Sequence, residues 1–122
     1  MNSFGVEVKK TENVQVVLVT GYFSEDAGKR LFSLVSDLLL KKNLSFVIDF
    51  TNCNLINSPG VVALMNTTLK IVDDYKGKLC LIGVDDLKLT VFKMAGIFPL
   101  ADQADSIEEA ILKLGSPGNL DK

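Results

Sequence analysis

Short β-branched or apolar runs alternate along this chain with longer segments of helical periodicity, and this alternation constrains the fold most. Five runs have the length and composition of strands: residues 4–9, 14–20, 44–50, 79–84 and 97–101. Residues 11–13 are turn material between the first two runs and predict a hairpin, and Gly21 is expected to end the second run. The last run contains Pro99, which cannot donate a ladder hydrogen bond, so it predicts a short edge strand.

Four segments place apolar residues at helical spacing. They begin at Ser24, Ser58, Asp85 and Ser106. The resulting order is two strands followed by alternating helices and strands, which predicts an α/β fold with a mixed β-sheet of four to five strands and about four helices packed on it. A length of 122 residues suits a single core, so we expect one domain over residues 1–114 and a flexible tail over residues 115–122.

Composition and charge argue against several classes of function. The chain has 13 basic and 15 acidic residues, so we expect no nucleic-acid partner. No apolar run approaches the ~20 residues of a membrane-spanning helix, and the start MNSFGVEVKK lacks the apolar stretch of a signal peptide. We therefore expect a cytoplasmic protein without membrane insertion. The sequence has no histidine, the commonest general base and metal ligand, so we expect no enzyme, no metal site and no cofactor.

Several smaller features have structural interpretations. Cys53 and Cys80 lie in apolar surroundings without CxxC spacing and predict buried reduced thiols. The doublets Asp73-Asp74 and Asp85-Asp86 lie at helix ends and predict turns and caps rather than metal ligands. A stripe at helical spacing in the third helix is predicted to belong to the core: Leu87, Val91 and Met94.

The segment Asn57-Ser58-Pro59-Gly60 opens the second helix. Because proline suits the first position of a helix, Ser58 is predicted to be the N-cap residue. A hydroxyl at a helix N-terminus also lies where free N–H groups and the helix dipole favour an anion, so a phosphate on Ser58 would be well placed. Capping alone would account for this serine, and both interpretations stay open at this point.

Three segments in order resemble the STAS family of anti-sigma factor antagonists: the strand FVIDF, the turn INSPG before an apolar helix, and the late segment GIFPLADQADSIEEAI. The resemblance covers residues 4–113 and implies a STAS-like fold. In that family the strand carries an aspartate, matched here by Asp49, for which the sequence itself favours a structural role. The first serine of the family's turn is the target of a partner kinase, and Ser58 matches it.

The resemblance implies an anti-sigma factor antagonist that switches partners in transcription regulation and signal transduction. Its partner would be an anti-sigma factor or a related serine protein kinase that phosphorylates Ser58, with a phosphatase to reverse the modification. The implied partner-binding residues are Asn57, Ser58, Pro59, Gly60, Val61 and Ser24. Three of them differ from the family's usual pattern, because Asn57 and Ser24 stand where aspartates are common and Pro59 replaces a second hydroxyl residue.

Two alternatives keep the same fold. In the first, Asn57 and Pro59 fix a permanently competent surface, and the chain is a STAS-type binding module without a phosphoswitch. In the second, the same helix start binds a small anionic molecule or a nucleotide, although no glycine motif for nucleotide binding is present.

Overall fold

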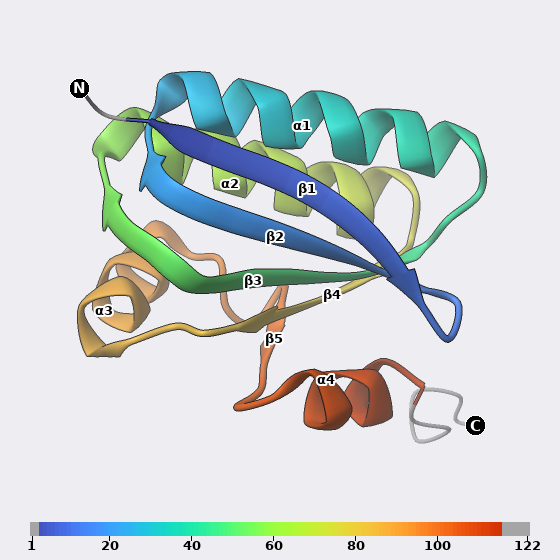
Figure 1. Ribbon diagram of the computed structural model, residues 1–122. Coiled ribbons are helices and arrows are strands. Elements are labelled where there is room, and N and C mark those ends of the chain that lie inside the picture. The colour runs from blue at the N-terminus through green and yellow to red at the C-terminus, as the bar shows by residue number, and fades with distance from the viewer. Residues whose placement is uncertain (1–2, 116–122) are drawn as a thin grey trace.

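The computed structural model describes residues 3–115, which form a five-stranded mixed sheet with helices on both faces (Figure 1). The strands are β1 Phe4–Thr11, β2 Val14–Phe23, β3 Ser45–Ile56, β4 Lys78–Ile82 and β5 Asp102–Gln103, and they lie in sequence order across the sheet. β1 pairs antiparallel with β2, whereas every later pair is parallel. The α/β class, the mixed sheet and the number of strands predicted from the sequence are confirmed.

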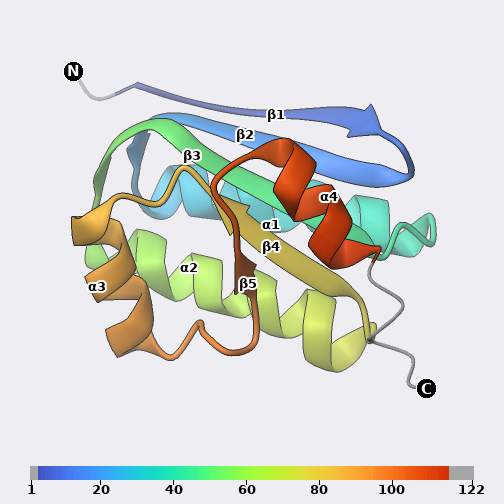
Figure 2. The same cartoon turned by 90° about the horizontal axis from the view of Figure 1, so that it is seen from below.

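Four α-helices pack on this sheet: α1 Glu25–Leu40, α2 Ser58–Leu69, α3 Asp86–Ala95 and α4 Ile107–Leu114. α1 and α2 cover one face, and α4 lies on the opposite face across β3 and β4 (Figure 2). α2 continues into a π-helical segment, η1 Lys70–Asp74, before the turn that leads to β4. The crossover from β3 through α2 to β4 therefore places the start of α2 at the carboxyl end of β3.

The hairpin between β1 and β2 turns through Glu12 and Asn13, which both have positive φ angles. Two central residues with positive φ define the turn whose twist matches that of paired strands, so the predicted hairpin is confirmed. The prediction that Gly21 ends the second strand is wrong. Gly21 has φ 77° and lies at a register shift between β2 and β3, and β2 runs on to Phe23. A glycine accepts this conformation inside a strand because it has no Cβ.

Two other boundaries differ from the predictions. β3 does not end at Phe50 but continues to Ile56 through residues that look like a polar loop, and its pairing with β2 resumes after the register shift. The predicted edge strand over residues 97–101 is wrong. There the chain makes local bonds instead, since the Ile97 N–H donates to the Phe92 carbonyl and the Ala101 N–H donates to the Ile97 carbonyl. The strand at this edge of the sheet is β5, which follows this turn.

The larger core lies between the sheet and helices α1 and α2, and three aromatic rings extend it toward α3. Phe23 and Phe50 meet edge to face with centroids 5.6 Å apart, and Phe50 lies 5.3 Å from Phe92 of α3. All three side chains are fully buried. Because such rings bury large apolar areas, this row fixes α3 against the end of β2 and the middle of β3.

The smaller core, between the sheet and α4, contains one of the two cysteines. Both Cys53 and Cys80 are buried free thiols, as predicted. Burial raises the pKa of the Cys80 thiol to about 11, and it also raises the pKa of Cys53. Thiols with raised pKa values carry little nucleophilic thiolate at neutral pH, so these two cysteines are structural.

Candidate functional site

The candidate site lies where β3 ends and α2 begins, and Asn57 sets its geometry. Asn57 has extended backbone angles, and its Oδ1 accepts a hydrogen bond of 2.9 Å from the Gly60 N–H. Its Nδ2 donates a bond of 2.7 Å to the Tyr22 hydroxyl at the end of β2. Asn57 is thus the N-cap residue of α2, and it also joins the helix start to the neighbouring strand.

The prediction that Ser58 is the N-cap residue is therefore wrong by one position. Asparagine caps a helix as well as serine does, and with Asn57 in that role Pro59 falls in the first turn, where a missing N–H costs nothing. Ser58 is the first helical residue, and its side chain is exposed. Because its Oγ bonds to no described residue, capping no longer explains why a serine stands here.

Close packing fixes the position of this helix start. Gly60 is buried, and a Cβ added there would collide with the backbone carbonyl of Phe23. The Asn57 N–H donates to the same carbonyl at 3.3 Å. The first turn of α2 is consequently seated directly on the end of β2, and Ser58 is held on a rigid support.

A cavity of about 300 Å³ opens beside Ser58, between the start of α2 and helix α3. Its lining comes from the end of β3, the first turn of α2 and the first two turns of α3: Asn54, Leu55, Ile56, Asn57, Ser58, Val61, Asp85, Leu87, Lys88 and Val91. The sequence analysis placed Ser58 and Val61 in the partner-binding surface, but it did not predict that α3 contributes to the same cavity. The partner-binding residues that the resemblance implied were limited to residues 57–61 and Ser24, so it gave no reason to place α3 beside them.

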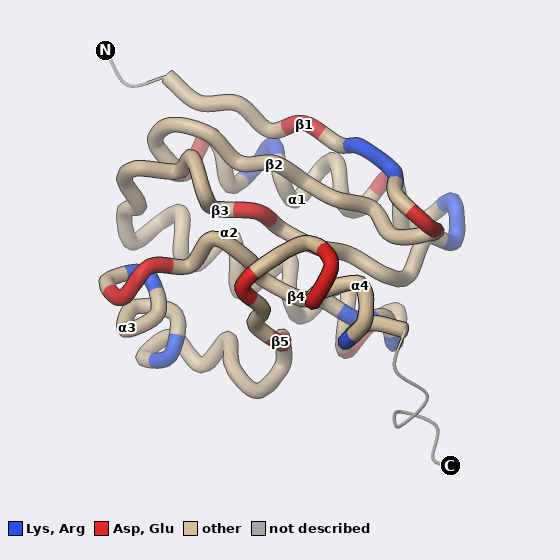
Figure 3. The backbone as a smooth tube through the Cα atoms, turned by 60° about the horizontal axis from the view of Figure 1, so that its bottom comes forward, with Lys and Arg blue, Asp and Glu red and all other residues tan. Residues whose placement is uncertain are grey.

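One ion pair lies in the wall of this cavity. Lys88 Nζ donates a bond of 2.6 Å to Asp85 Oδ2, and the Lys88 side chain is only 10% exposed whereas that of Asp85 is 59% exposed. Asp85 Oδ1 accepts from the Lys88 N–H at 2.9 Å, so Asp85 is the N-cap residue of α3, as the doublet predicted. The hydrogen bond from Lys88 lowers the pKa of Asp85. Figure 3 shows the acidic start of α3 followed by basic positions.

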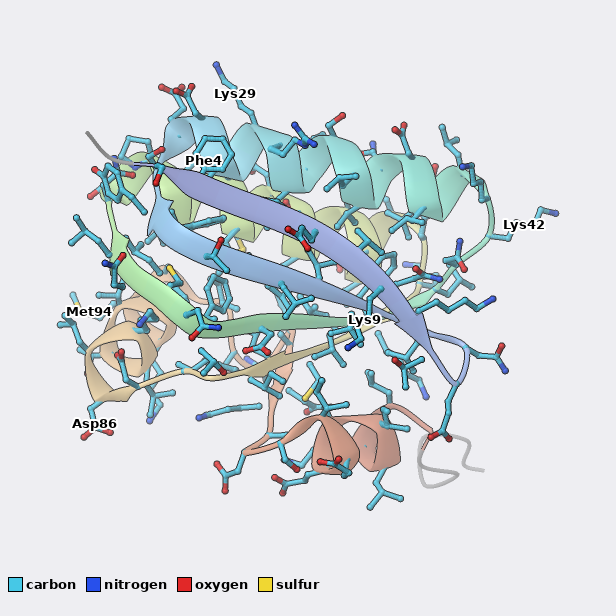
Figure 4. All side chains as sticks on the ribbon, in the orientation of Figure 1. Phe4, Lys9, Lys29, Lys42, Asp86 and Met94 are labelled. Atoms are coloured by element: carbon cyan, nitrogen blue, oxygen red, sulfur yellow. The ribbon has the colours of Figure 1, made fainter. Side chains whose placement is uncertain are left out.

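Large apolar side chains on the rim of the cavity are open to solvent. Leu55 is 52% exposed and Leu87 76% exposed, and Met94 extends the face that begins at Leu87 with an exposure of 84%. Met94 projects from α3 away from the sheet (Figure 4). The prediction that Leu87, Val91 and Met94 form a core stripe is wrong for Leu87 and Met94, because α3 buries its Phe92 side instead. Val91 is partly buried and packs against the core. Large apolar side chains gathered on one exposed face are typical of interaction surfaces.

The remaining predicted residues occupy related positions. Ser24 precedes α1 at the end of β2, is half-buried, and its side chain makes no capping bond. Pro59 is exposed, Val61 lines the cavity, and Gly60 is buried beneath them. Asp49 lies in mid-strand, where its Oδ1 accepts bonds from the backbone and hydroxyl of Thr51, in line with the structural role favoured for it. Asp49 does not line the cavity.

Within residues 3–115 no three histidine, cysteine or acidic side chains gather into a possible metal site. None of the helices described combines the length and the apolar character needed to cross a bilayer. The predicted tail over residues 115–122 lies outside the described residues except for Gly115.

Solved structures of other proteins share this architecture. An anti-sigma factor antagonist from Mycobacterium paratuberculosis matches with a TM-score of 0.78 at 16% identity, over 92% of this chain and 94% of that chain. The chain has the STAS fold. The Bacillus cell fate determinant SpoIIAA in its phosphorylated form matches with a TM-score of 0.70 at 20% identity, over 91% of this chain and 98% of its own.

A third neighbour with the STAS fold belongs to a sulfate transporter family. A sulfate transporter family protein from Wolinella succinogenes matches with a TM-score of 0.75 at 18% identity, over 92% of this chain and 93% of that chain. The sequence matches no protein-family model and no curated protein. At these identities the likeness establishes the fold that the sequence resemblance implied, and the neighbours on which it rests are chiefly anti-sigma factor antagonists.

Proposed function

We propose that this chain is a partner-switching regulator of the anti-sigma factor antagonist type. It binds an anti-sigma factor kinase, or a related serine protein kinase, through the surface around Ser58, and phosphorylation of Ser58 releases it. A phosphatase restores the binding form, and this cycle of phosphorylation and dephosphorylation takes place in the cytoplasm. The kinase supplies the catalytic groups, ATP and magnesium, and this chain is its substrate.

This proposal rests mainly on the exposed hydroxyl of Ser58. Ser58 is solvent-accessible, its Oγ bonds to no described residue, and it lines the same cavity as the exposed apolar side chains Leu55 and Leu87. A kinase active site can reach such a hydroxyl, and a partner can bury such a rim. The STAS fold supports the same interpretation, because SpoIIAA, an anti-sigma factor antagonist, has been solved in both unphosphorylated and phosphorylated forms.

The switch has a direct physical cause. The kinase transfers the γ-phosphoryl group of ATP to Ser58 Oγ, which forms an O–P bond and yields ADP and the proton of the hydroxyl. This adds a charge of about −1.5 to −2 next to apolar side chains that a partner must desolvate. The domain itself tolerates the charge, since the N-terminal turn of a helix favours an anion. Partner affinity therefore falls while the fold persists.

The test is phosphorylation of the intact chain by its cognate kinase with Mg-ATP, followed by mass spectrometry. We expect one added phosphoryl group on wild-type protein and none on Ser58→Ala. Ser33→Ala is a matched control, because Ser33 is an exposed serine in mid-helix α1, away from the cavity. Absence of phosphate, or phosphate on another residue, would overturn the proposed switch.

One observation favours a second candidate, a binding module without the phosphoswitch. Asn57 already bonds to Gly60 and to Tyr22, so the helix start is rigid. The first turn of α2 also carries no acidic residue. This candidate predicts that Ser58→Ala leaves both partner affinity and signalling unchanged. The phosphoswitch predicts unchanged affinity with Ser58→Ala but signalling that can no longer be turned off.

A further inference from the structure

We propose that Lys88 is the cation that receives the phosphate of phosphorylated Ser58, an inference that rests on the proposed function of Ser58. Both residues line the same cavity, Ser58 from the first turn of α2 and Lys88 from the first turn of α3. Lys88 is the single cation among the lining residues, and Asp85 is the single anion. The cavity thus already contains one cation that can pair with a phosphate.

Lys88 has unused hydrogen-bonding capacity. A lysine ammonium has three N–H donors, and among the described residues Lys88 Nζ uses one of them, in its bond to Asp85 Oδ2. Its side chain is nine-tenths buried and lies in the wall of the cavity that Ser58 also lines. A dianionic phosphate on Ser58 brings three acceptor oxygens into the cavity and competes with Asp85 for these donors.

The transfer of the Lys88 ammonium from Asp85 to the phosphate leaves α3 capped. Asp85 holds Lys88 through Oδ2 but accepts the capping bond from the Lys88 backbone N–H through its other oxygen, Oδ1. Lys88 can therefore turn from the carboxylate to the phosphate while the start of α3 stays in place. No covalent bond changes in this step. The result is a phosphate tied to both helices across the cavity, which closes the apolar site to a partner.

The experiment uses phosphoserine installed at position 58 during translation, so it requires no kinase. Titration of the folded chain followed by ³¹P NMR gives the second pKa of the phosphate. We expect Lys88 to lower this pKa, and Lys88→Met to raise it by about one unit toward the ordinary value near 6. Lys93→Met, which removes an exposed lysine from the same helix, should leave the pKa unchanged.

Two further variants protect the test against misfolding. Lys88→Arg keeps the cation and should keep the low pKa, and Asp85→Asn keeps a good capping residue, removes the competing carboxylate and should lower the pKa further. Equal phosphate pKa values in wild type and Lys88→Met, or in wild type and Asp85→Asn, would overturn the inference. Failure of a kinase to modify Ser58 would instead overturn the proposed function, so the two failures are distinguishable.

Discussion

Replacement of Asn57 by alanine removes two bonds that set the geometry of the site. The capping bond to the Gly60 N–H, at 2.9 Å, contributes about 1 kcal/mol to the stability of a helix. The bond from Nδ2 to the Tyr22 hydroxyl, at 2.7 Å, contributes about 1 kcal/mol more because it is partly buried. Asn57→Ala should therefore lower the free energy of unfolding by about 2 kcal/mol, which for a domain of this size lowers Tm by about 8 °C.

The assay is urea unfolding followed by circular dichroism, with two comparison variants. Tyr22→Phe removes only the second bond and should cost about 1 kcal/mol. Asn54→Ala alters an exposed asparagine of the same cavity that bonds to no described side chain, and it should change stability by less than about 0.5 kcal/mol. Equal losses for Asn57→Ala and Asn54→Ala would refute the capping role of Asn57.

Three other changes test the surroundings of the site. Leu87→Gln should leave the urea midpoint nearly unchanged but weaken partner binding by about tenfold or more in a titration, and unchanged binding would exclude α3 from the interface. Gly60→Ala should lower the free energy of unfolding by about 1–3 kcal/mol, because the new Cβ meets the Phe23 carbonyl, and a neutral result would contradict the tight seating of α2. Asp85 has a folded-state pKa below its unfolded value, so its contribution is present above about pH 4 and is lost as the pH falls through the folded pKa. The stability gap between wild type and Asp85→Asn should thus shrink in acid, whereas a gap independent of pH would contradict the Lys88 bond.

The sequence determined the element order because each signal was local. Turn residues marked the β1–β2 hairpin, Gly96 marked the end of α3 with φ 84°, and Ser106 with Glu109 marked the start of α4, where the Glu109 N–H donates to Ser106 Oγ. Such local signals are sufficient to place elements in order and, with their periodicity, to predict a mixed sheet.

The candidate site was less predictable because it depends on contacts between distant segments. Helical spacing showed that Leu87, Val91 and Met94 share one face, but spacing cannot say which face the tertiary structure buries. Phe92 is the side chain of α3 that packs on Phe50, and Leu87 and Met94 are exposed while Val91 is partly buried against the core. The one-residue error at Ser58 arose because asparagine and serine have similar capping preferences, and the Tyr22 bond that selects Asn57 spans 35 residues.

The most direct test of the proposed function compares the affinity of the unmodified and Ser58-phosphorylated chains for the cognate anti-sigma factor kinase by calorimetric titration. We expect the unmodified chain and Ser58→Ala to bind alike, and the phosphorylated chain to bind at least tenfold more weakly while its circular dichroism stays the same. Equal affinity of the phosphorylated and unmodified chains would contradict the claim that Ser58 is the switch.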